Sequence, residues 1–159
     1  MSAQNNQNRK MQNLINGVKI ADDAVGNDEL GAYQTKTMVY SFGSDISQRD
    51  VGAHVLSPLA GTTLPDNAIV TGYHVDVTTP LASSGSATIA LGFATDGAGI
   101  VKAATAFDDA SFVAATQKGG VPVASKKLTA ARPLLATVGT AALTAGVMLI
   151  YIQYIEGSA

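Results

Sequence analysis

Short segments that alternate apolar and polar residues fill the chain after Tyr33. In the clearest segment, residues 68–79, Val75 alternates with His74 and Asp76. Successive side chains of a strand point to opposite faces, so this alternation indicates a strand with one face in a core. No long amphipathic helix interrupts the series, which argues against a parallel α/β fold. The pattern predicts an all-β domain.

Other segments show the same strand character, and turn residues separate them: 37–42, 51–56, 86–95, 134–138 and 147–155. Turn signals include Pro65-Asp66 ahead of Asn67, and the run 96–99. Two alternating runs around the polar loop 80–85 predict a hairpin between 68–79 and 86–95. We therefore expect a β-sandwich or jelly roll of about seven or eight strands.

Two segments fit more than one structure. Residues 100–117 fit either a short helix around 102–110 or irregular strands, and Lys118-Gly119-Gly120 ends the segment. Residues 133–155 carry no charge and are long enough to cross a bilayer as a helix. Their glycines, threonines and β-branched residues instead favour two strands joined by a turn. The last strand is apolar on both faces, so we expect it to be buried on both sides.

The first part of the chain has a different composition. Eight of residues 1–16 are Asn or Gln, and there is no apolar run of the kind that a secretory signal requires. Such a segment cannot bury enough apolar surface to fold alone. Residues 17–30 are acidic and irregularly patterned, as in a connector along a surface. We expect an extended arm and connector over 1–32 and a β-sandwich domain over 33–159.

The charge balance limits the possible partners. The formal net charge is −2, and only 14% of the residues are charged. This balance provides no broad field for gripping nucleic acid or an anionic membrane, so we expect neither as a partner. Such low charge suggests that copies of the chain, or other proteins, cover much of its surface.

Catalytic and metal-binding patterns are weak. The sequence has no Cys, and its two histidines are His54 and His74. His74 and Asp76 would share a strand face, but a metal site needs three or four ligands. The pair Asp108-Asp109 fits solvated turn residues better than catalytic carboxylates, which face each other across a substrate. We therefore expect no enzyme activity, no metal and no cofactor.

Several longer stretches resemble phage virion proteins. Residues 20–25 with Leu30 are similar to connectors of bacteriophage fibre and head-appendage proteins, and residues 64–77, 87–93 and 142–154 resemble β domains of small phage virion proteins. Together they are similar to the capsid decoration (cement) proteins of tailed bacteriophages. That resemblance implies a β-sandwich body, often trimeric, with an arm that grips neighbouring capsomers.

The same resemblance implies where the chain acts. It would be made in the host bacterial cytoplasm and would bind the major capsid protein on the capsid exterior as a homo-oligomer, with a trimer favoured. Contacts with the shell are expected from one set of arm residues: Asn8, Arg9, Lys10, Leu14, Ile15, Lys19 and Ile20.

Three other functions remain open. A head- or tail-fibre segment with a receptor-binding tip would share the connector, although such tips more often show exposed aromatics and long loops. A small carbohydrate-binding module is disfavoured because the sequence has no Trp, although its five tyrosines could stack on sugars. A hydrolase on a jelly-roll scaffold would need an acid, base or nucleophile set that the sequence does not display.

Overall fold

The computed structural model describes residues 35–157, apart from 61–62, 95–96, 114–116 and 125–126. All seven arm residues predicted to contact a shell lie outside this range. The described residues form a short 3-10 helix, η1 (Ile46–Arg49), and eight strands: β1 (Lys36–Phe42), β2 (Gly52–Val55), β3 (Ala68–Ser83), β4 (Thr88–Phe93), β5 (Gly97–Ala106), β6 (Gln117–Gly120), β7 (Leu134–Gly139) and β8 (Leu143–Glu156).

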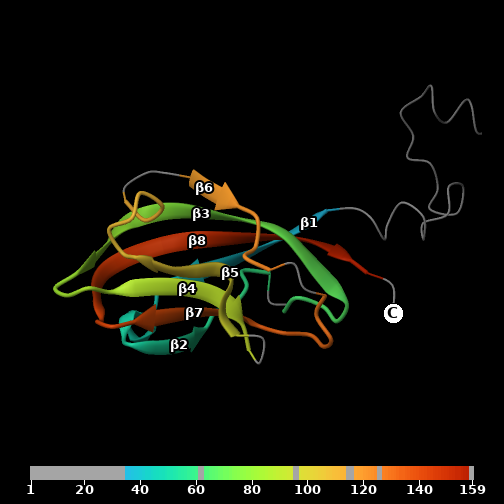
Figure 1. The fold of residues 1–159 in the computed structure, drawn as a ribbon, viewed down its shortest axis with the longest axis horizontal. Helices are drawn as coiled ribbons and strands as arrows, with labels where there is room; N and C mark the ends of the chain where they lie inside the picture. The colour runs from blue at the N-terminus through green and yellow to red at the C-terminus, as the bar shows by residue number, and fades with distance from the viewer. Residues whose placement is uncertain (1–34, 61–62, 95–96, 114–116, 125–126, 158–159) are drawn as a thin grey trace, which may run out of the picture. The chain divides into compact units, whose positions relative to one another are not determined.

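The strands form two four-stranded antiparallel sheets, with the order β1-β8-β3-β6 in sheet A and β2-β7-β4-β5 in sheet B. Figure 1 shows these two layers one above the other. Four of the strand pairs are β1–β8, β2–β7, β3–β6 and β4–β5. These pairs form when a chain folds into one long antiparallel hairpin and the hairpin then rolls up. This is the eight-stranded jelly roll. The predicted all-β sandwich is confirmed.

The predicted hairpin between 68–79 and 86–95 is wrong. β3 belongs to sheet A and β4 to sheet B, so the chain crosses between the layers after Ser83. β3 is also longer than predicted and includes Pro80 to Ser83. Alternation shows only that each strand has one face in the core. Two strands that face the same core from opposite sheets show the same alternation as two paired strands of a hairpin.

Residues 100–117, which fit either a helix or strands, contribute to strands in the structure. Residues 97–106 form β5, which pairs with β4 and leaves no helix around 102–110. Lys118-Gly119-Gly120 does not end a segment but belongs to β6, an edge strand that pairs with the middle of β3. Residues 134–156 form the two predicted strands, β7 and β8, and Thr140 in the turn between them has a φ of 68°. No helix in the described parts of the chain is long and apolar enough to cross a membrane.

The core lies between the two sheets. It contains large side chains that are almost completely shielded from solvent, among them Tyr40, Phe42, Phe112, Leu91 and Ile150. The Tyr40 hydroxyl donates a hydrogen bond to Met38 Sδ at 2.9 Å, and burial raises the pKa of this phenol. A phenol kept in its neutral form fits an apolar interior.

The last strand differs from its prediction. Met148, Ile150 and Ile152 of β8 are buried in the core, but the alternate residues Leu149 and Tyr151 are half-buried. Sheet B covers only one face of sheet A, so the other face of β8 lies on the outside of the sandwich. The expectation that β8 is buried on both sides is therefore wrong, and its outer apolar residues need another explanation.

One end of the sandwich is closed by η1 and two glycines. Gly43 follows β1 with a φ of +81°, and a Cβ placed on it would lie 2.1 Å from the carbonyl oxygen of Gly146. The side chain of Gln48 accepts a hydrogen bond from the Gly43 N–H, and Arg49 Nη2 donates one to the Gly43 carbonyl. The end of β1 is thus hydrogen-bonded to η1 and lies against Gly146 of β8.

Candidate functional site

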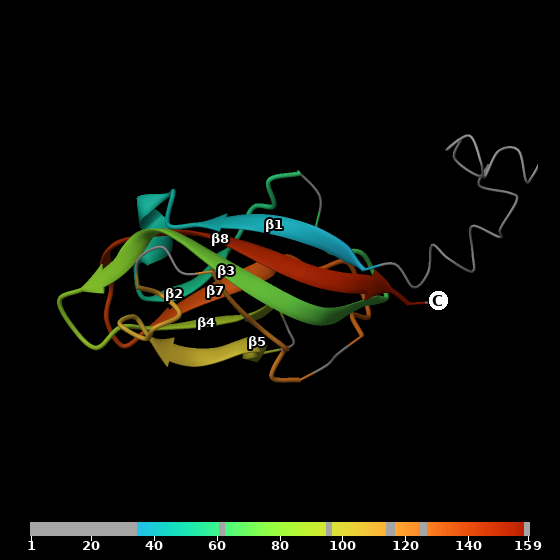
Figure 2. The same cartoon turned by 90° about the horizontal axis from the view of Figure 1, so that it is seen from above.

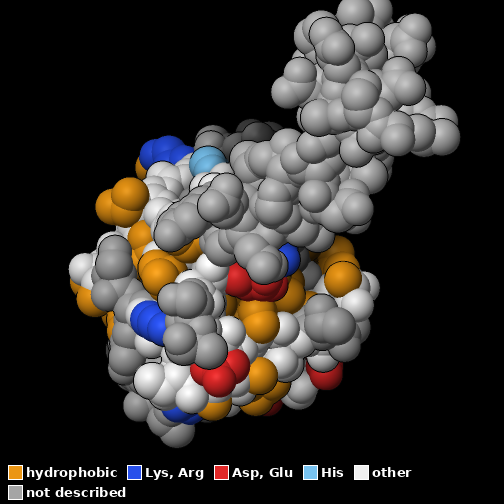
Figure 3. All heavy atoms as spheres, turned by 90° about the vertical axis from the view of Figure 1, so that its right-hand side faces the viewer, with side chains coloured by type: hydrophobic (Ala, Val, Ile, Leu, Met, Phe, Trp, Pro, Cys, Tyr) orange, Lys and Arg blue, Asp and Glu red, His pale blue; other side chains and the backbone are white. Residues whose placement is uncertain are grey.

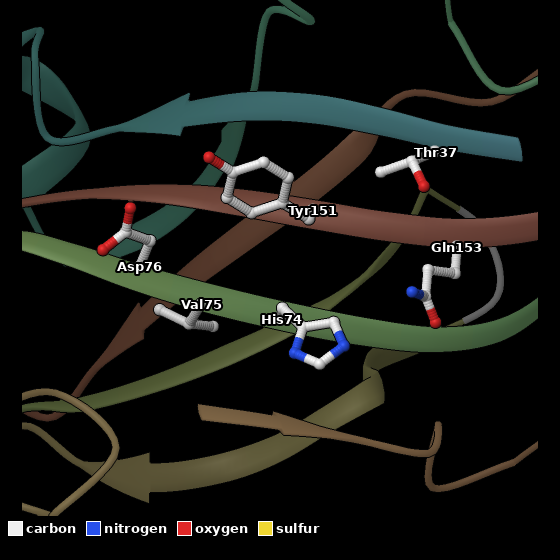
Figure 4. A pocket seen from close by; sticks show the side chains of 6 residues that line it. All are labelled: Thr37, His74, Val75, Asp76, Tyr151 and Gln153. Atoms are coloured by element: carbon white, nitrogen blue, oxygen red, sulfur yellow. The ribbon is translucent and has the colours of Figure 1, made fainter. Parts of the chain in front are cut away.

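The outer face of sheet A carries a groove of about 430 Å³. It crosses the three strands that lie side by side in Figure 2, namely β1, β8 and β3. Its lining residues are Thr37 from β1, His74, Val75 and Asp76 from β3, and Tyr151 and Gln153 from β8. Figure 4 shows these side chains around the groove.

Strand register brings the groove residues together. His74 is directly opposite Tyr151 in the β3–β8 pair, and Gln153 is directly opposite Thr37 in the β1–β8 pair. Asp76 faces Leu149, two pairs further along. Directly opposed side chains in an antiparallel sheet lie within about 5.5 Å at their Cβ atoms, so these residues form one continuous surface.

A local irregularity gives β3 this arrangement. The register of β3 shifts between Val70 and Gly72, where one extra residue enters the strand. Before the shift, Val70 points into the core; after it, Val75 and Val77 do so, which leaves His74 and Asp76 on the outer face. This confirms the predicted common face of His74 and Asp76, and β-bulges of this kind re-aim side chains near functional sites.

Two glycines make room for the groove side chains. A Cβ on Gly72 would lie 2.6 Å from Gln153 Oε1, so the Gln153 amide occupies the space above that glycine. A Cβ on Gly119 would lie 2.1 Å from His74 Nδ1, so the imidazole packs over β6. These positions hold Gln153 and His74 close to the sheet.

The histidine and acidic side chains considered as metal ligands do not lie together in the structure. His54 lies on β2 in the other sheet, where its Nε2 is 2.7 Å from the Asp50 carbonyl oxygen. Asp109 accepts hydrogen bonds from the Ser111 hydroxyl at 2.5 Å and its N–H at 2.8 Å, which hold the pKa of Asp109 below its ordinary value. Within the described ranges, no three His, Asp or Glu side chains lie close enough together to hold a metal ion.

Exposed apolar side chains also lie in or next to the edge strands, which are β1 and β6 in sheet A and β2 and β5 in sheet B. The β1–β2 edge patch consists of Ile46, Val51, Val55 and Leu59, and Leu59 is tied to β1 by an N–H to the Val39 carbonyl. The β5–β6 edge patch consists of Val121 and Val123, which are 79% and 66% exposed. Val123 is tied to β5 by an N–H to the Val101 carbonyl.

Charge is scattered on the surface that Figure 3 presents, with single basic and acidic side chains between apolar ones. One contact between opposite charges joins the first and last strands, where Lys36 Nζ lies 2.8 Å from Glu156 Oε2. Since both side chains are more than 40% exposed, this pair contributes little to stability. The charge distribution on this face does not favour a polyanion as ligand.

Two solved structures of phage capsids contain chains that are similar to this chain. The chain is similar to a chain in the acidic stable capsid structure of Helicobacter pylori bacteriophage KHP30, with a TM-score of 0.54 and 16% identity, over 78% of this chain and 89% of that chain. It is also similar to a chain in the cyanophage Pam1 capsid asymmetric unit, with a TM-score of 0.49 and 17% identity, over 77% and 84%. No protein-family model and no curated protein matches the sequence.

The chain shares its fold with a chain of a phage capsid structure. At 16% identity the likeness concerns the fold and carries over no residue roles. Sequence reasoning identified His74 and Asp76 as neighbours but missed Thr37 and Gln153, and it did not foresee the two edge patches. The sequence does not show that valines in short loops are exposed, because their exposure depends on which strands form the sheet edges.

Proposed function

We propose that this protein is a non-catalytic structural component of a bacteriophage virion. The observation that carries the proposal is the shared jelly-roll fold with a chain of the KHP30 capsid structure, which spans most of both chains. The low charge and the exposed apolar edges support an assembled state, because free monomers seldom expose such side chains in groups.

The more specific role that we propose is capsid decoration. The sandwich sits on the capsid exterior, and the arm binds the major capsid protein across a joint between capsomers. Packed double-stranded DNA pushes a shell outward, and clamps across joints resist that separation. An arm that becomes ordered only on docking covers much surface, at a cost in ordering entropy. Repeated copies then compensate for weak individual contacts through multivalency.

We further propose that copies of the sandwich associate head to tail into a ring, with a trimer as the favoured size. A closed ring needs two different surfaces on each subunit, whereas a two-fold dimer uses one surface twice. The two edge patches are such a pair.

The decisive experiment is the copy number of this chain relative to the major capsid protein in purified virions, measured by quantitative mass spectrometry. A ratio near one, or a simple fraction of one, supports decoration. A few copies per particle would indicate the alternative, a fibre or tail segment. Absence from virions would contradict the virion proposal altogether.

The arm is tested by deleting residues 2–30. We expect the truncated protein to keep the folded sandwich, because the described strands begin at Lys36 and the core that they form runs from Met38 to Tyr154. Binding to undecorated shells, measured by co-sedimentation, should be lost. A matched variant in which Arg9, Lys10 and Lys19 become Ser tests the charged part of the arm. Full decoration by the truncated protein would refute the arm's role.

A further inference from the structure

We propose that the groove on the outer face of sheet A binds a neutral saccharide. The proposal concerns a site on the sandwich and is independent of whether the arm binds a shell. Five side chains would form the site: Thr37, His74, Asp76, Tyr151 and Gln153.

The centre of the groove is an aromatic platform. His74 and Tyr151 are directly paired across β3 and β8. In Figure 4 both rings show their broad faces to the viewer, who looks onto the outside of the sheet. The C–H face of a pyranose ring is apolar and slightly positive, so it stacks on the negative face of an aromatic ring. The platform supplies this surface without Trp.

Polar groups lie at both ends of the platform. Asp76 is two residues beyond His74 on β3, and Gln153 is two residues beyond Tyr151 on the antiparallel strand β8. They therefore extend in opposite directions and stand about 13 Å apart along the strands, at about 3.3 Å per residue. This span suits an oligosaccharide of two or three sugars lying across the rings.

The polar groups have the chemistry that sugar hydroxyls require. The Asp76 carboxylate accepts hydrogen bonds from hydroxyls, while the Gln153 amide and the Thr37 hydroxyl both donate and accept. Gln153 is held near the sheet above Gly72, and His74 over Gly119, so both are placed before a ligand arrives. Such placement reduces the entropy lost on binding.

The lining also argues against other ligands. The lining residues that the structure describes include no Lys or Arg, so among them a phosphate or sulfate would meet the Asp76 carboxylate and no cation. These residues offer one carboxylate and one imidazole, fewer than the ligands a metal site needs. With hydroxyl, amide and carboxylate groups around two rings, it is too polar for a lipid chain. A neutral saccharide fits all five side chains.

The test is a titration of the full-length, ¹⁵N-labelled protein followed by NMR, with maltotetraose, cellotetraose, chitotetraose and β-1,4-galactotetraose as the probes. We expect saturable shifts for at least one probe at the amides of His74, Asp76, Tyr151 and Gln153. An open groove with few contacts predicts a dissociation constant on the order of 1 mM.

Variants separate stacking from hydrogen bonding. Tyr151→Ala should weaken binding at least about tenfold, the loss expected of an aromatic contact of about 1.4 kcal/mol. Tyr151→Phe keeps the ring and should bind almost as well as the native protein. His54→Ala on the other sheet is the matched control for His74→Ala and should have no effect. The same spectra show whether each variant is folded.

Three results would overturn the proposal: no saturable shift with any probe, shifts confined to other surfaces, or a folded Tyr151→Ala that binds as tightly as the native protein. None of them bears on the copy number in virions, so failure of the saccharide site and failure of the decoration role can be told apart.

Discussion

Single glycines decide how the ends of the strands meet. Gly43 combines a left-handed φ with a close approach to Gly146, and each of these alone would disfavour a side chain. Gly52 provides a comparison, because its φ is +147° but the nearest atom to an added Cβ is 3.9 Å away. The two positions share backbone strain and differ in steric crowding.

Gly43→Ala should therefore destabilise the sandwich by about 3–5 kcal/mol, the combined cost of a left-handed φ and an overpacked contact. Gly52→Ala should cost only about 1–2 kcal/mol, since strain alone remains. Urea denaturation of both variants measures the difference. Equal losses of stability would show that the contact with Gly146 is not what excludes a side chain at Gly43.

Asp109 offers a residue-level test of pH dependence. The Ser111 hydroxyl is the main cause of its lowered pKa, and the Ser111 backbone N–H adds to it. A carboxylate with a lowered pKa stabilises the fold above its unfolded value, here about 3.8, and this contribution is lost as the pH falls through the folded value. Ser111→Ala should raise the pKa of Asp109 toward 3.8 but leave it below, because the backbone N–H remains. Carboxyl NMR titration checks this, with Asp45 as the unchanged reference.

At the scale of elements, β8 is an inner strand of sheet A, since it pairs with β1 on one side and β3 on the other. Its two faces have different roles. Ile150 is fully buried between the sheets, whereas Leu149 lies on the outer face. The energetic cost of truncating them should differ accordingly.

Ile150→Ala should lower the free energy of unfolding by about 3–4 kcal/mol, because it leaves a cavity in a packed core. Leu149→Ala should cost less than about 1 kcal/mol in the isolated protein. Chemical denaturation of the two variants provides the measurement. A large loss for Leu149→Ala would mean that the outer face is covered in the isolated protein.

The strands also show which parts of the fold could be predicted from the sequence. Alternation identified β3 and β4, because burial of one face leaves a period of two, whereas β8 was identified by its β-branched and aromatic residues. It could not identify their partners, so the hairpin between β3 and β4 was predicted wrongly. β6 gave no strand signal, since Lys118-Gly119-Gly120 has low strand propensity and pairs because its glycines accommodate Tyr73 and His74. Thr37 and Tyr151 are far apart in sequence, and only the register reveals that they line one groove.

At the scale of the whole molecule, the edge patches predict how copies associate. If copies form the proposed ring, changing Val121 and Val123 to Ser should lower its mass measured by light scattering, and so should changing Val51 and Val55 to Ser. Each pair removes one half of a head-to-tail contact, and an incomplete ring loses its closing interface. If one pair has no effect while the other dissociates the assembly, the contact is two-fold rather than head to tail.

The adjacency of the first and last strands has a mechanical consequence. The proposed arm would continue into β1, an edge strand whose seven residues are all paired with β8, from Lys36–Tyr154 to Phe42–Met148. A pull on the arm along β1 loads this whole ladder in shear, so many hydrogen bonds must break together. A pull across the sheet peels β1 away one pair at a time, starting at the exposed Lys36–Glu156 contact. An arm attached there would therefore resist load along the strand while yielding to load across it.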